Sequence, residues 1–219
     1  MPFSYILEKD LFICGGPINN GGIALQWWLK SQGEQPLNQA IYDTFFATVA
    51  TVEAGSKGLL FLPYLTGERA PIWDSESCGA FFGLNLQHQQ PHFSRAVVEG
   101  ICYAMTQVLE TVERQDAEII QIHISGGFSK SMVWAQILAD ITGKKLVLVQ
   151  AEDASAVGAT YLALRSLWIL DQYPKVDLDH LKIISPNPEH REIYSKNLII
   201  FKKLYFDLQE SMHQLHQLN

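Results

Sequence analysis

Residues 119–132 read Ile-Ile-Gln-Ile-His-Ile-Ser-Gly-Gly-Phe-Ser-Lys-Ser-Met and carry the clearest fold signal of the chain. Apolar residues alternate over 119–124, which predicts a strand, and apolar residues at helical spacing predict a helix over 130–142. Between them, Gly126 and Gly127 let the backbone turn sharply and leave bare main chain for a flat ligand. Amides that open the following helix favour negative or polar ligand atoms. The stretch predicts an α/β core, with either a nucleotide site or an ordinary strand-to-helix connection at the turn.

Strand and helix patterns alternate along most of the chain. Strands are predicted over 3–7, 11–14, 59–62, 119–124 and 145–149, and helices over 23–30, 37–52, 94–114, 130–142 and 155–167. This alternation predicts a three-layer α/β/α domain. Residues 63–90 form a long irregular segment, and compact domains seldom carry such a loop without a use for it.

The composition is that of a globular protein, with 219 residues, 47% of them hydrophobic and 18% charged. A net charge of −7 without any Lys/Arg run argues against a nucleic acid as the main partner. No apolar run reaches the roughly 18 residues needed to span a bilayer, and the N-terminus lacks the pattern of a secretory signal. Three widely spaced cysteines indicate reduced thiols, so we expect a cytoplasmic protein.

A second glycine-rich turn, residues 15–22, reads Gly-Gly-Pro-Ile-Asn-Asn-Gly-Gly and precedes a predicted helix, which Asn19 or Asn20 is available to cap. Neither glycine turn has P-loop spacing or a Gly-x-Gly-x-x-Gly fingerprint, which argues against a Walker fold and a Rossmann oxidoreductase. The sequence also lacks a metal-spaced His/Cys/Asp cluster and a Gly-x-Ser-x-Gly elbow. The two glycine turns therefore remain the main chemical signal.

Residues 67–74, Gly-Glu-Arg-Ala-Pro-Ile-Trp-Asp, place three charged side chains in the long irregular segment. Glu68 and Arg69 have a simple interpretation as a surface ion pair, and Asp74 as the cap of the next turn. The functional interpretation is a loop at the mouth of a cleft, which closes over substrate or locks against a partner domain.

The C-terminal segment has apolar residues at strict 4-3 spacing: Tyr194, Leu198, Phe201, Tyr205, Leu208, Met212 and Leu215. This spacing is typical of a coiled coil, which would make the chain a homodimer. A terminal helix docked on its own domain gives the same pattern and is the favoured interpretation.

Residues 79–84 (Gly-Ala-Phe-Phe-Gly-Leu) and 93–100 (Phe-Ser-Arg-Ala-Val-Val-Glu-Gly) closely resemble the second signature of the FGGY carbohydrate kinases. The 67–74 run, the Ser-Gly-Gly-Phe run at 125–128 and the helix around Gly158 follow in the family's order. The likeness extends over about residues 5–170. Within the family, the 15–22 turn looks most like the gluconate kinases, and the xylulose kinases are the alternative.

The resemblance implies an actin/hexokinase-like (ribonuclease H-like) ATPase fold, of which this chain is the C-terminal, nucleotide-binding lobe. It implies ATP as cofactor, Mg²⁺ bound through its phosphates, and a sugar or sugar acid as acceptor, most simply gluconate converted to 6-phosphogluconate. Ser131 stands where glycerol kinases have an asparagine against the adenine, so that contact is lost or made by the hydroxyl. Carried over motif by motif, the nucleotide-binding positions are Gly21, Gly22, Gln26, Gly126, Gly127 and Ser131.

The family's general base is an aspartate near the end of an N-terminal sugar-binding domain, and no matching motif precedes Phe3. Asp10 and Asp74 lie outside the catalytic motif, so no catalytic residue is assigned. We expect a nucleotide-binding domain over 1–185, a helix packed on it over 186–219, and a chain that is inactive without the sugar-binding domain. A stand-alone actin-like nucleotide-binding module that acts through a partner is the alternative from another functional class.

Overall fold

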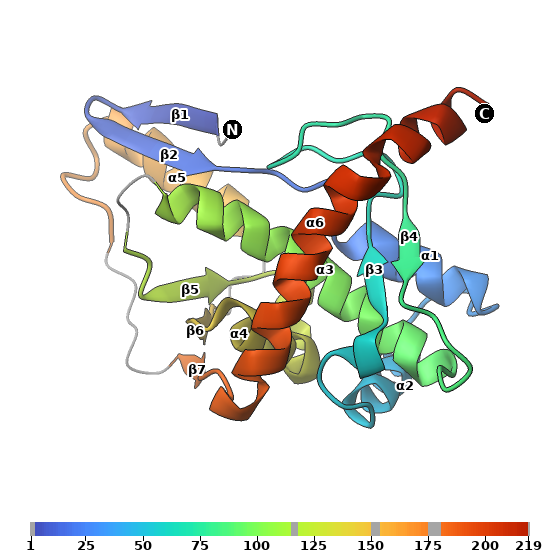
Figure 1. The fold of residues 1–219 in the computed structure, drawn as a ribbon. Helices are drawn as coiled ribbons and strands as arrows, with labels where there is room; N and C mark the ends of the chain where they lie inside the picture. Colours follow the sequence, from blue (N-terminus) through green and yellow to red (C-terminus); the bar gives the residue numbers. More distant parts are fainter. Residues whose placement is uncertain (1–2, 115–117, 150–153, 175–180, 219) are drawn as a thin grey trace.

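The computed structural model describes residues 3–114, 118–149, 154–174 and 181–218. The strands are β1 (Phe3–Glu8), β2 (Leu11–Gly15), β3 (Leu60–Leu62), β4 (Ala80–Phe82), β5 (Gln121–Ile124), β6 (Lys145–Leu148) and β7 (Lys182–Ile184). The α-helices are α1 (Gly22–Ser31), α2 (Gln39–Ala50), α3 (Gln90–Glu113), α4 (Met132–Thr142), α5 (Ala154–Ser166) and α6 (Arg191–His216) (Figure 1). Short 3-10 turns are η1 (Ser56–Gly58), η2 (Gly127–Lys130) and η3 (Pro188–His190).

The strands of the described residues form three small sheets. The pairs β1–β2 and β3–β4 are antiparallel, while β5 runs parallel to β6, which pairs antiparallel with β7. The predicted strands and helices are all present, with bounds shifted by four residues or fewer. The sequence pattern misses β4 and β7, because three residues are too few to show a period. The equally short β3 was predicted from the continuous apolar run 59–62. The predicted α/β class is confirmed, whereas alternation alone did not indicate how the strands divide into sheets.

Helix α3 runs through the middle of the molecule and packs against α1, α2, α4 and β3 (Figure 1). It meets β3 at Gly100, where a Cβ atom would come within 2.2 Å of the carbonyl oxygen of Phe61, so only glycine permits this approach. The helix begins at Gln90, before its predicted start at 94. Gln89 and His92 form a capping box there, and Pro91 occupies the first turn, where its missing N–H costs nothing.

Helix α6 crosses the front of the molecule and contacts β3 and α4 (Figure 1). Its heptad positions Tyr194, Leu198, Phe201, Tyr205 and Met212 are buried against the rest of the same chain. The structure therefore shows the docked arrangement, and the face that would form a coiled coil is largely used internally. Self-association and the boundary between 1–185 and 186–219 stay predictions.

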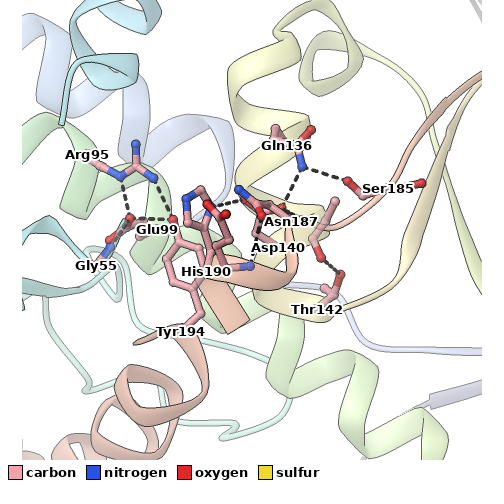
Figure 2. A network of polar contacts seen from close by, with 12 residues as sticks. Gly55, Arg95, Glu99, Gln136, Asp140, Thr142, Ser185, Asn187, His190 and Tyr194 are labelled. Atoms are coloured by element: carbon pink, nitrogen blue, oxygen red, sulfur yellow. Dashed lines mark hydrogen bonds and ion pairs between the residues drawn. The ribbon is translucent and has the colours of Figure 1, made fainter. Parts of the chain in front are cut away.

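A buried ion pair ties α3 to its neighbours (Figure 2). Arg95 Nε lies 2.7 Å from Glu99 Oε1, and Arg95 Nη1 donates to the carbonyl oxygen of Val52 at 2.7 Å, just beyond the C-terminus of α2. Glu99 accepts the amide N–H of Gly55 at 2.9 Å, and the Tyr194 hydroxyl donates to it at 2.9 Å. Both charges are buried and hydrogen-bonded, so the pair fixes α2 and α6 relative to α3.

A second buried carboxylate, Asp140 on α4, joins that helix to the start of α6 (Figure 2). Its Oδ1 accepts from the backbone N–H of Asn187 and from Gln136 Nε2, both at 2.7 Å. Its Oδ2 lies 2.8 Å from His190 Nδ1. These contacts hold the segment after β7 against α4.

Candidate nucleotide site

A cavity of about 980 Å³ opens between the start of α1, one face of α2 and the segment that leads from β5 into α4. This volume is at the upper end of the roughly 300–1,000 Å³ typical of small-molecule sites. The lining includes Gly21, Gly22, Gln26, Gln39, Tyr42, Asp43, Phe46, Met105, Ile124, Ser125, Gly127, Lys130, Ser131 and Trp134.

The cavity brings together residues from the two glycine turns, which are far apart in the sequence. Gly21, Gly22 and Gln26 line one side, and Gly127 and Ser131 line the other. Gly126 lies between two lining residues and makes the turn with a φ of 78°, a left-handed conformation that favours glycine. The structure thus places the predicted nucleotide-binding positions around a single space, and their contacts with a nucleotide stay a prediction.

The turn after β5 is open. A Cβ atom added at Gly126 or Gly127 would meet nothing within 4 Å, so both glycines leave room beside the backbone. Ser131 is the N-cap of α4, and its hydroxyl accepts the Trp134 N–H at 3.3 Å. The exposed Lys130 adds a positive charge to the lining of the cavity.

The turn before α1 differs from its sequence prediction in one respect. Gly21 is the N-cap of α1, and no side chain caps the helix there. The expectation that Asn19 or Asn20 caps α1 is wrong, because both side chains donate instead to the carbonyl oxygen of Gly67, at 3.4 and 2.7 Å. Gly21 and Gly22, at the start of α1, both line the cavity, and Gly22 has open space at its Cβ position. The first amides of a helix generally have no partner within the helix.

The charged loop 67–74 does not line the cavity. The surface-pair interpretation of Glu68 is wrong, because this side chain is only 3% exposed and accepts the N–H of Asn19 at 2.5 Å. Arg69 is exposed, and its backbone N–H donates to Glu68 at 2.8 Å. Asp74 caps its own turn, as expected, by accepting the Glu76 N–H at 2.9 Å. Closure of this loop over a substrate stays a prediction.

Asp74 also binds helix α6. Its Oδ2 accepts the Tyr205 hydroxyl at 2.9 Å and lies 2.8 Å from His213 Nε2, while Glu76 lies 3.8 Å from the other ring nitrogen. Burial raises the pKa of Asp74, but hydrogen bonds from His213, the Glu76 amide and Tyr205 outweigh it and hold the pKa below its usual value. The hydrogen bond to Asp74 raises the pKa of His213.

Sequence reasoning missed the wall that α2 contributes. Gln39, Tyr42, Asp43 and Phe46 all line the cavity, and Gln39 Nε2 donates to Asp43 Oδ1 at 2.9 Å. Their spacing of three and four residues puts them on one helix face. The same spacing fits a helix that faces solvent, so only the tertiary structure shows that this face meets the glycine turns.

Neither a membrane span nor a protein metal cluster is present among the described residues. Every described helix is too short or too polar to cross a bilayer. No group of three or more His, Cys, Asp or Glu side chains in this part of the chain is arranged to hold a metal ion.

Comparison with known proteins shows the family of the chain. The model of the FGGY family of carbohydrate kinases, C-terminal domain, matches residues 2–167. A gluconokinase of Bacillus subtilis (strain 168) is 38% identical over 181 residues, which cover 80% of this chain and 35% of the relative. Two crystal structures of proteins from Lactobacillus acidophilus match 98% of this chain and 43% of their own chains. For gluconate kinase the TM-score is 0.86 and the sequence identity 31%, and for ligand-bound xylulose kinase the TM-score is 0.84 and the identity 32%.

The chain spans less than half the length of each of these relatives. Its fold is the actin/hexokinase-like ATPase fold of the sugar kinases, as the resemblance implied. Both glycine turns and the cavity between them lie within the matched residues. The chain belongs to the FGGY family of carbohydrate kinases and corresponds to its C-terminal domain.

Proposed function

We propose that this chain is the ATP-binding lobe of an ATP-dependent carbohydrate kinase. The observation that carries the proposal is the meeting of two glycine turns, at 21–22 and 126–127, around one cavity of about 980 Å³. In this proposal the adenosine lies against Gly126 and Gly127, where the positions of the missing Cβ atoms are open. The phosphates lie toward the start of α1, where backbone amides and the helix dipole favour negative charge.

The residues present fit such a ligand. Gly22, Gly126 and Gly127 each have open space where a Cβ would stand, so backbone is accessible at both ends of the cavity. Lys130 supplies a cation, and Tyr42 and Phe46 supply flat apolar surface. Magnesium would enter bound to the phosphates, whose charge it neutralises during phosphoryl transfer.

We propose gluconate as the acceptor, so that the whole enzyme forms 6-phosphogluconate and ADP in the cytoplasm. The gluconokinase and gluconate kinase relatives support this choice, and xylulose is the alternative because a xylulose kinase is equally similar in structure. Transfer also needs a base that takes the proton of the acceptor hydroxyl, aligned with the terminal phosphate. Asp10 and Asp74 do not line the cavity. The FGGY resemblance implies that the base belongs to the sugar-binding domain, so we expect that separate domain to supply it.

The test is calorimetric titration of this chain with MgATP. Gly22→Val and Gly127→Val add side chains at two lining positions where a Cβ atom meets nothing within 4 Å, so we expect folded proteins whose Kd for ATP rises at least about tenfold. Gly158→Val is the matched control, because Gly158 also has open space around it but lies on α5, outside the cavity lining. Absence of ATP binding by the unmodified chain, or equal binding by all three variants, would contradict the proposal.

The acceptor is tested by coupled assays. We expect this chain alone to give no gluconate-dependent ADP release, and we expect turnover when a sugar-binding domain of a gluconate kinase is supplied. Turnover restored by the sugar-binding domain of a xylulose kinase, with xylulose as acceptor, and not by that of a gluconate kinase would favour the alternative. Turnover by this chain alone would overturn the assignment of the base to another domain.

A further inference from the structure

The first glycine turn is held by a loop that is distant in the sequence and does not line the cavity. Asn20, which directly precedes the turn, is fully buried. Its Nδ2 donates to the carbonyl oxygen of Gly67 at 2.7 Å and lies 3.3 Å from Glu68 Oε2, and its Oδ1 accepts the hydroxyl of Thr66 at 3.2 Å. Every polar atom of this side chain is therefore committed to the loop 66–68.

The Glu68 carboxylate completes the attachment. Its Oε1 accepts the backbone N–H of Asn19 at 2.5 Å, and the N–H of Ala70 donates to the carbonyl oxygen of Pro17 at 3.1 Å. A Cβ at Gly16 would stand only 2.6 Å from the Cβ of Ala70, so the two segments are in close contact. A buried carboxylate that accepts N–H groups forms strong, charge-assisted hydrogen bonds.

The loop is itself anchored. Glu68 and Asp74 exchange backbone hydrogen bonds, N to O, of 2.8 and 2.9 Å. The Asp74 side chain is in turn held by Tyr205 of α6. The loop that binds the first glycine turn through Glu68 is therefore itself fixed to Asp74 and, through Asp74, to α6.

The attachment has a consequence for the start of α1. Asparagine is among the preferred helix N-caps because its side chain readily bonds to the first amides of the helix. Here the side chains of Asn19 and Asn20 point to the loop, and α1 has no side-chain cap. Because the loop binds the side chains of Asn19 and Asn20, neither side chain competes with an anion for the amides at this helix end.

We propose that Glu68, acting through Asn20, is a positioning residue that keeps the amides at the start of α1 open for the phosphates of the nucleotide. This inference rests on the proposed function. It assigns Glu68 a role without contact to the ligand, and it predicts an effect that depends on the phosphates and not on the base.

Glu68→Gln is the sharpest variant, because the amide retains an oxygen for the Asn19 N–H but turns an NH₂ group toward Asn20 Nδ2, replacing a donor–acceptor pair by two donors. We expect the Kd for MgATP and MgADP to rise roughly tenfold, the size of one lost charge-assisted contact. We expect the Kd for adenosine, which has no phosphate, to stay within about twofold.

Asp140→Asn is the matched control. Asp140 is also 3% exposed and also accepts a backbone N–H, that of Asn187, but it holds a segment away from the first turn. We expect this variant to lose stability in a thermal melt and to bind MgATP like the unmodified chain. Asn20→Ala provides a second route to the measurement, with the same expected loss for ATP but not for adenosine, should Glu68→Gln fold poorly.

The outcomes are separable. If the unmodified chain binds neither ATP nor adenosine, the proposed function itself fails. If the unmodified chain binds both, two results would overturn the positioning role. One is an equal loss of ATP and adenosine affinity in Glu68→Gln, and the other is a loss of ATP affinity no larger than that in Asp140→Asn. A selective loss for ATP and ADP supports it.

Discussion

The two glycine turns that meet at the cavity are built in opposite ways. The first is fixed by side chains from a distant loop, with Asn20 fully buried and Glu68 3% exposed beside it. The second, at 125–127, is exposed, and its glycines have open space at their Cβ positions. One end of the candidate site is therefore shaped before any ligand arrives, while the other leaves room for the ligand to complete it.

This difference suits the two parts of a nucleotide. Phosphates are recognised through directional hydrogen bonds to amides, so a fixed turn reduces the entropy lost on binding. A base or ribose is held mainly by contact area, for which a bare glycine backbone beside apolar side chains is sufficient. We therefore expect the two turns and the segments that hold them to differ in three ways: the stability lost on substitution, the protection of amides by ligand, and the pH dependence of the melting temperature.

The largest expected effect is a loss of stability when alanine replaces a glycine, and it should differ between the two regions. Gly67→Ala in the loop that holds the first turn combines a φ of 66° with a Cβ only 2.6 Å from the carbonyl oxygen of Ser75. We expect it to lower the free energy of unfolding by about 3 kcal/mol. Gly126→Ala has a φ of 78° but open space, so about 1 kcal/mol is expected.

Urea unfolding monitored by circular dichroism gives both values. Gly33→Ala is the control for conformational strain alone, because Gly33 has a φ of 87°, nothing within 4 Å and a position outside the cavity. Equal losses for Gly67→Ala and Gly126→Ala would show that the two regions are equally constrained.

A smaller effect is expected in hydrogen exchange. The amides of Asn19 and of residues 68–70 should exchange slowly with or without nucleotide, because protein contacts already hold them. The amides of 125–130 should exchange quickly in the free chain and slow by roughly tenfold or more with saturating MgATP, since ligand binding removes open states. Slowing confined to the first turn would reverse the assignment of fixed and adaptable ends.

The smallest effect concerns pH. Both charges of the Asp74–His213 pair, which anchors the loop to α6, are present between the lowered pKa of Asp74 and the raised pKa of His213. The Asp74 contribution is lost as pH falls through its folded-state pKa. The His213 contribution is complete below the unfolded value of about 6.5 and is lost as pH rises through its higher folded-state pKa.

We therefore expect the melting temperature to fall slightly as pH is raised through and above neutrality, with Asp74 and Glu76 as the charged groups that face the imidazole. His213→Gln should remove this part of the pH dependence. His88→Gln is the control, since that histidine faces a different loop. An identical pH profile for the His213 variant and the unmodified chain would show that the pair has no role in stability.

Local features made the main elements predictable. Apolar alternation up to 124, adjacent glycines and helical spacing after 130 identify β5, the second turn and α4 within two residues. The heptad spacing likewise predicted the long helix α6, and burial of Tyr194, Phe201 and Tyr205 shows where its apolar face goes. In each case the signal lies within one continuous segment, where period and burial correspond directly.

The rest of the site depends on contacts between distant segments. Asn20 was expected to cap α1 on local preference, yet it binds residues 46 to 48 positions away. Glu68 looks like a surface charge because nothing near it in the sequence indicates that the chain from 17 to 20 covers it. The α2 wall was missed for the same reason, since a polar helix face such as Gln39 and Asp43 gives no sign of what lies opposite.

The central claim is that two turns about a hundred residues apart form one ATP site. The most direct measurement is a titration of the ¹⁵N-labelled chain with MgATP, followed through the backbone amide resonances of Gly22 and Gly127. If the two turns form one site, both resonances shift and both curves give the same Kd. Shifts at only one of the two glycines, or two clearly different values of Kd, would contradict it.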